Sequence, residues 1–173
     1  MNDPVVAARR ARAIRLHRAL YAVWDTPPGL PRFAAVNHTI VGRRFMLTAL
    51  AFFAAAGLLA MLIRTQLAVP ENDFLGPDAY HQIVTVHGTV MMFLFAIPFI
   101  EGLAIYILPK LLGARDLAYP RLSAFGYWCY LIGGTTVLGS IAVGAAPDSG
   151  WFMYAPLSTK PYSPGIGADV WLL

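Results

Sequence analysis

Hydrophobic residues gather in three long stretches along the chain, and charged residues stay almost entirely outside them. The stretches cover about residues 43–64, 79–109 and 121–147, and Glu101 is the only charged side chain away from their ends. Because roughly 20 apolar residues cross about 30 Å of hydrocarbon as a helix, this pattern predicts three membrane-spanning helices.

Composition agrees with a membrane protein. Hydrophobic residues make up 58% and charged residues 13% of the 173 residues, whereas about a quarter of the residues in soluble domains are charged. The predicted fold class is therefore all-α, a polytopic transmembrane helical bundle. We expect a basic N-terminal tail over residues 1–42 and a membrane domain over 43–173. A new apolar run begins near the C-terminus, so we also expect a fourth span to start there and the sequence to be a fragment.

Basic residues indicate the orientation of the predicted bundle. Eight of the 13 Lys and Arg residues precede residue 45, residues 65–78 contain none, and the connection over 110–121 is basic again. Because Lys and Arg concentrate in cytoplasmic loops, we predict a cytoplasmic N-terminus and a multi-pass protein of the cell inner membrane. The charge pattern indicates contact with the lipid bilayer, and we expect no nucleic-acid partner.

A histidine interrupts the second stretch, in VTVHGTVMMF at residues 84–93. His87 lies about 12 Å along the predicted helix, and Arg64 ends the first stretch on the same side, so we expect comparable depths. Neutral imidazole is a good axial ligand of heme iron, and an arginine can neutralise a heme substituent. A lone histidine in a membrane helix more often hydrogen-bonds a neighbouring carbonyl or hydroxyl, and Thr85 and Thr89 are near His87.

Two carboxylates lie on the side predicted to be cytoplasmic. Glu101 follows His87 by about 21 Å along the helix, where it could take up protons, pair with a neighbouring helix or be wetted by a cavity. Asp116 lies in the loop between Arg115 and Arg121, a pattern typical of a loop salt bridge. Pro98 is expected to kink the second helix, with neighbouring helices satisfying the freed backbone groups.

Over residues 37–173, the chain resembles subunit I of the heme-copper respiratory oxidases, cytochrome c oxidase in particular. The resemblance rests on short motifs in the family's order and spacing: NH at 37–38, LIR at 62–64, VHGTVM at 86–91, GARD at 113–116, YPR at 119–121 and GWFMYAPL at 150–157.

The resemblance implies roles for several residues. His87 matches an axial ligand of the low-spin heme, and Arg64 matches the arginine that hydrogen-bonds the formyl group of heme A. Trp151 and Tyr154 match residues near the heme propionates. Asp116 matches the aspartate at the mouth of a proton-uptake route.

The chain also departs from the family pattern. Ile105 or Tyr106 stands where the family commonly has an asparagine, and the residues at 122–124 are Leu-Ser-Ala rather than Met-Asn-Asn. Glu101 is therefore expected to belong to a variant proton pathway. Gln66 replaces an acidic residue, which argues against the family's small outer cation site.

The implied function is that of a terminal oxidase, which oxidises cytochrome c, reduces oxygen to water and takes up protons. Its implied partners are cytochrome c and oxidase subunits II and III. Copper and a second, high-spin heme would be held by helices beyond these residues, so we expect no catalytic residue within them. Three alternatives stay open: a quinol oxidase of the same family, a non-catalytic three-helix membrane assembly protein, and a transporter with Glu101 and Asp116 as a proton relay.

Overall fold

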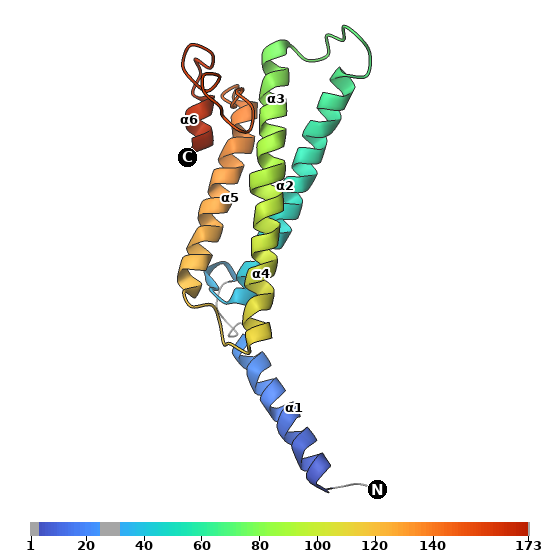
Figure 1. Ribbon diagram of the computed structural model, residues 1–173, viewed down its shortest axis with the longest axis vertical. Helices are drawn as coiled ribbons and strands as arrows, with labels where there is room; N and C mark the ends of the chain where they lie inside the picture. The colour runs from blue at the N-terminus through green and yellow to red at the C-terminus, as the bar shows by residue number, and fades with distance from the viewer. Residues whose placement is uncertain (1–3, 25–31, 173) are drawn as a thin grey trace.

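The computed structural model describes residues 4–24 and 32–172, and every regular element in that part of the chain is helical (Figure 1). The elements are α1 (Pro4–Trp24), the 3-10 helix η1 (Arg32–Ala34), α2 (His38–Gln66), α3 (Pro77–Thr89), the π-helical segment η2 (Val90–Ala96), α4 (Ile97–Leu112), α5 (Pro120–Ala142) and α6 (Gly167–Leu172). The predicted all-α fold class is confirmed.

Three long helical elements form the bundle. α3, η2 and α4 make one continuous rod, α2 runs antiparallel along it, and α5 contacts both (Figure 1). The backbones of α2 and α4 meet at two glycines, where a Cβ on Gly42 would lie 2.7 Å from the carbonyl oxygen of Gly102. We call the end of the bundle with the loop over 67–76 the His87 half, and the end with the loop over 113–119 the Asp116 half.

Two helices in the described part of the chain are long and apolar enough to cross a membrane. They are α2, with 29 residues, and the rod over Pro77–Leu112, with 36 residues. α5 has 23 residues, enough for about 34 Å of helix, but its tyrosines, tryptophan, threonines and glycines lower its hydropathy. The crossing predicted over 121–147 and the predicted fourth span stay predictions.

Two glycines end helices α4 and α5. Gly113 follows α4 with φ 65°, and the N–H of Ala114 bonds the carbonyl of Pro109 at 2.8 Å. Gly144 follows α5 with φ 66°, and the N–H of Ala145 bonds the carbonyl of Ser140 at 2.9 Å. Glycine adopts this left-handed backbone conformation without strain. α5 therefore ends at Ala142, five residues before the predicted limit of the third stretch.

A side chain from α5 replaces the backbone hydrogen bond that Pro98 cannot donate. A proline cannot donate the helical hydrogen bond to the carbonyl four residues earlier, here that of Leu94. The Tyr130 hydroxyl on α5 donates to that carbonyl at 2.6 Å. The π-helical turns of η2 lie directly before Pro98, so the irregularity expected there takes the form of a widened helix.

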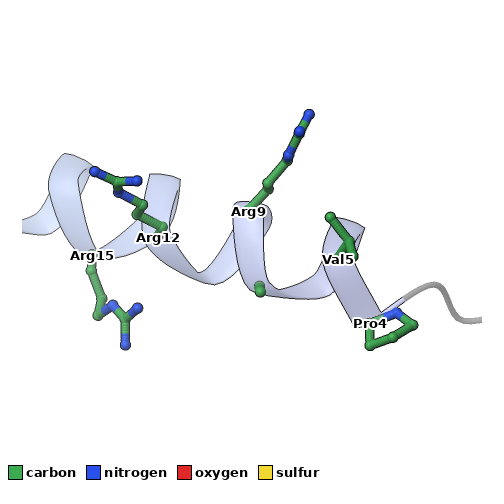
Figure 2. A pocket seen from close by; sticks show the side chains of 6 residues that line it. Pro4, Val5, Arg9, Arg12 and Arg15 are labelled. Carbon is green, nitrogen blue, oxygen red and sulfur yellow. The ribbon is translucent and has the colours of Figure 1, made fainter.

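The basic tail includes α1, although residues 1–3 and 25–31 of the predicted tail lie outside the described residues. The side chains of Arg9, Arg12 and Arg15 point away from α1 in different directions (Figure 2). The shallow hollow between them is lined by residues of this one helix. Because no second element of the described chain lines it, the hollow is not a built binding site.

Candidate functional site

His87 on α3 bonds the backbone of α2. Its Nδ1 lies 3.0 Å from the carbonyl oxygen of Ala56. A carbonyl only accepts hydrogen bonds, so Nδ1 carries the proton and Nε2 of the neutral ring keeps its lone pair. No described residue hydrogen-bonds Nε2, and the side chain is half-buried. Histidines that bind metals commonly donate their second N–H to a carbonyl in this way.

The two threonines beside His87 bond other partners. The Thr85 hydroxyl accepts from the backbone N–H of Gly150 at 2.9 Å, and the Thr89 hydroxyl accepts from the indole N–H of Trp171 at 2.9 Å. The hydrogen-bond partner expected for His87 is therefore a carbonyl rather than either hydroxyl.

Trp151 packs against the backbone of α3 directly after His87. A Cβ on Gly88 would lie 2.6 Å from Cδ1 of the Trp151 indole, so only glycine leaves room for this contact. Trp151 stacks on Phe152, with ring centroids 3.7 Å apart, and Phe152 stacks on Tyr154 at 5.1 Å. Trp151 thus lies beside the His87 turn, whereas Tyr154 is exposed and two rings away.

We call these contacts the α3 latch, which consists of Thr85, Gly88 and Thr89 on α3 with Gly150, Trp151 and Trp171. Within little more than one helical turn, the latch fixes the segment after α5 over the face of α3 that flanks His87.

Arg64 lies farther from His87 along the bundle than the sequence suggested. The antiparallel pairing of α2 and α3 sets His87 beside Ala56, and Arg64 follows Ala56 by eight residues, about 12 Å along the axis. The expectation of comparable depths is therefore wrong by about two turns. Arg64 is exposed. Nearby, the Gln66 side chain bonds Asn72 and accepts from the N–H of Leu75, which fixes the loop.

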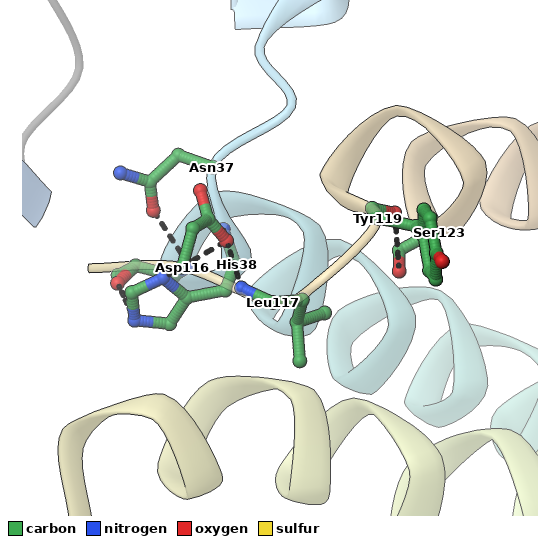
Figure 3. Close-up of polar contacts among 7 residues, drawn as sticks. Asn37, His38, Asp116, Leu117, Tyr119 and Ser123 are labelled. Atoms are coloured by element: carbon green, nitrogen blue, oxygen red, sulfur yellow. Dashed lines mark hydrogen bonds and ion pairs between the residues drawn. The ribbon is translucent and has the colours of Figure 1, made fainter. Parts of the chain in front are cut away.

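Asp116 pairs with a histidine rather than with an arginine. Its Oδ1 accepts from the backbone N–H of His38 at 3.2 Å and of Leu117 at 2.8 Å, and lies 3.3 Å from His38 Nδ1 (Figure 3). The flanking Arg115 and Arg121 are exposed and form no ion pair with it. The expected loop salt bridge thus had the wrong partner, because the loop carries Asp116 to the N-terminus of α2, where free N–H groups favour an anion.

His38 is fully buried at this contact, while the Asp116 side chain is 24% exposed. The Asn37 side chain caps α2 beside it by accepting from the N–H of Thr39 at 2.7 Å. Asp116 therefore both reaches solvent and holds the start of α2.

The face of α4 that carries Ile105 is apolar. Ile105 packs with Val41, Phe45, Ala124 and Tyr127 in what we call the Ile105 cluster.

Tyr106 points elsewhere, toward Arg43 and Lys110. Of the two positions considered for the family's asparagine, Ile105 is the one that faces α5. Glu101 is exposed on α4 and forms no ion pair with any described residue.

Residues 40–173 match the family model described as Cytochrome C and Quinol oxidase polypeptide I. The chain belongs to this family of oxidase subunits. It is 50% identical over 135 residues to the heme-copper oxidase subunit I+III of Aeropyrum pernix, which covers 78% of this chain and 17% of that protein. It is 44% and 43% identical over 138 residues to cytochrome c oxidase subunit 1 of Corynebacterium efficiens and of Corynebacterium glutamicum, covering 79% of this chain and 24% of each relative. The chain thus spans at most about a quarter of the length of these relatives.

Family membership and the two apolar helices identify an integral membrane protein.

Sequence reasoning missed two groups at the candidate sites. His38 had a usable signal, because it follows the capping residue Asn37. The Ala56 carbonyl had none, because every residue carries the same group.

Proposed function

We propose that this chain is the N-terminal part of subunit I of a terminal respiratory oxidase, in which His87 is one axial ligand of a low-spin heme A. The hydrogen bond from His87 Nδ1 to the Ala56 carbonyl carries the proposal, because it leaves Nε2 with the lone pair that iron needs. The complete enzyme would pass electrons from cytochrome c to oxygen and reduce it to water.

The residues around His87 fit a bound heme. The carbonyl of Ala56 fixes the orientation of the imidazole ring, and the α3 latch restricts water on the flanking face. Trp151 would lie near the propionates, with Tyr154 farther out, and Arg64 would bond the formyl group at the edge of the ring. Heme iron, when bound, takes up and passes on single electrons.

Proton uptake is the second part of the proposed function. Asp116 is partly exposed and can exchange protons with the cytoplasmic side. Because Ile105 closes the face toward α5, protons would continue along a variant route for which Glu101 supplies a carboxylate. Other parts of the enzyme would hold copper and the high-spin heme and would contact subunits II and III. The enzyme would lie in the inner membrane, with the N-terminus of this chain on the cytoplasmic side.

The test is His87→Ala in the complete oxidase, with His81→Ala as the matched control. His81 is an exposed histidine on the same helix. We expect the His87 variant to lose the low-spin heme A absorbance and the His81 variant to keep it. Unchanged heme content and spectrum in the His87 variant would favour the non-catalytic assembly protein, and proton-coupled solute uptake without heme would favour the transporter.

A quinol oxidase is the second candidate function, because the matching family description names both electron donors. Oxygen consumption by membranes, measured with reduced cytochrome c and separately with a quinol, distinguishes the two enzymes.

A further inference from the structure

Two cations from different helices meet on one tyrosine ring in the Asp116 half. Nζ of Lys110 lies 3.2 Å from the centroid of the Tyr106 ring, and Cζ of Arg43 lies 5.6 Å from it. Lys110 and Tyr106 lie one turn apart on α4, and Arg43 follows Gly42, where α2 and α4 touch. We call Arg43, Tyr106 and Lys110 the Tyr106 site.

Neither cation of the Tyr106 site has a carboxylate partner among the described residues. The ion pairs among the described residues join His38 to Asp116 and Lys160 to Asp169. A cation over an aromatic face is attracted to the ring, but two like charges beside one ring also repel each other. An anion between them would offset that repulsion.

The helix faces that continue from the Tyr106 site are apolar and exposed. On α2, Leu47 and Leu50 follow Arg43 at helical spacing, with 68% and 46% of their surface exposed. On α4, Leu103 precedes Tyr106 by one turn and is 41% exposed. Paired cations at the end of a membrane helix, followed by an apolar face, match a phospholipid with an anionic headgroup and acyl chains.

We propose that the Tyr106 site binds the headgroup phosphate of an anionic phospholipid in the cytoplasmic leaflet. Arg43 and Lys110 contact the phosphate oxygens, the Tyr106 ring holds the two cations together, and the acyl chains lie along Leu47, Leu50 and Leu103. The site depends on the membrane location of the chain and not on heme binding by His87.

The test measures binding of phosphatidylglycerol to the delipidated, complete oxidase by native mass spectrometry. Each basic residue near an anionic lipid contributes about 1 kcal/mol, so Arg43→Gln and Lys110→Gln should each raise the apparent Kd roughly fivefold. Arg121→Gln is the matched control, an exposed basic residue in the same half but outside the site, and it should leave the Kd within about twofold.

Size-exclusion elution checks that each variant is folded, and the two substitutions on different helices test the site separately. Phosphatidylcholine should bind more weakly, and an equal concentration of inorganic phosphate should not displace phosphatidylglycerol. Wild-type binding by both site variants would overturn the proposal, as would equal weakening by Arg121→Gln. Displacement by inorganic phosphate would identify a site for a soluble anion instead.

Discussion

His38 and His87 lie in opposite halves of one bundle, and they use their ring nitrogens differently. His38 is fully buried, with Nδ1 3.3 Å from Asp116 and Nε2 3.3 Å from the Thr39 hydroxyl. His87 is half-buried and, among the described residues, bonds only through Nδ1, to a carbonyl that fixes its tautomer. A buried histidine with a polar neighbour beside each nitrogen stabilises the fold, whereas a histidine that bonds through one nitrogen can still bind a metal with the other.

The packing around the two histidines differs as well. In the Asp116 half, two backbones meet at Gly42 and Gly102. In the His87 half, a backbone meets the Trp151 side chain at Gly88. An indole can shift and a helix backbone cannot, so the Asp116 half is expected to be the less tolerant of added volume.

The largest expected effect comes from adding a methyl group at these contacts. Gly42→Ala should destabilise the subunit by about 3 kcal/mol and Gly88→Ala by about 1–2 kcal/mol, because overpacking forces backbone or side-chain shifts. Gly57→Ala is the control, since nothing lies within 4 Å of a Cβ there. Thermal stability of the detergent-purified oxidase measures all three, and a greater loss at Gly88 than at Gly42 would reverse the comparison.

The next largest effect on stability is expected when a polar residue is placed in the Ile105 cluster. Ile105→Asn places a polar amide in the buried Ile105 cluster, which should destabilise the subunit by about 1–3 kcal/mol. Tyr106→Asn, at the half-buried neighbouring position, should cost less. The same thermal measurement applies, and equal losses would contradict the assignment of Ile105 as the residue that faces α5.

Substitutions of Asp116 separate its structural role from its proposed proton-uptake role. Asp116→Ala removes the acceptor of the backbone N–H groups of His38 and Leu117 and should destabilise the subunit by about 1–3 kcal/mol. Asp116→Asn keeps an oxygen acceptor, so stability should change by less than about 1 kcal/mol while proton uptake falls. Hydrogen exchange at the start of α2 and stopped-flow proton uptake report the two roles; wild-type uptake in Asp116→Asn would remove this residue from the proton route.

The smallest expected effect on stability comes from removing the hydrogen bond between the Tyr130 hydroxyl and the Leu94 carbonyl, which replaces the bond that Pro98 cannot donate. Tyr130→Phe removes the donor to the Leu94 carbonyl, which should cost about 0.6 kcal/mol, the mean for such bonds within membranes. In a Pro98→Ala background the backbone N–H of residue 98 can donate to the Leu94 carbonyl. The stability lost on Tyr130→Phe should therefore shrink toward zero. An unchanged loss in that double-mutant cycle would mean that the proline and the tyrosine are not coupled.

Much of the fold was readable from the chain because membrane helices need long uncharged runs, and Glu101 alone interrupts those runs here. Helix ends were predicted less well, because the end of α5 depends on the left-handed turn at Gly144 rather than on hydropathy. His87 and Trp151 stood out by motif, and the structure packs Trp151 against α3 at Gly88, the residue that follows His87.

The sequence by itself determined the helical class, the polar residues within the apolar runs and the family, since these depend on local composition and on the order of motifs. Only the tertiary structure decided that His87 bonds Ala56, that Asp116 pairs with His38 and that Ile105 rather than Tyr106 faces α5. These choices depend on the register and rotation of helices against each other. Register follows from close contacts between residues far apart in the chain, such as Gly42 with Gly102, which no local pattern records.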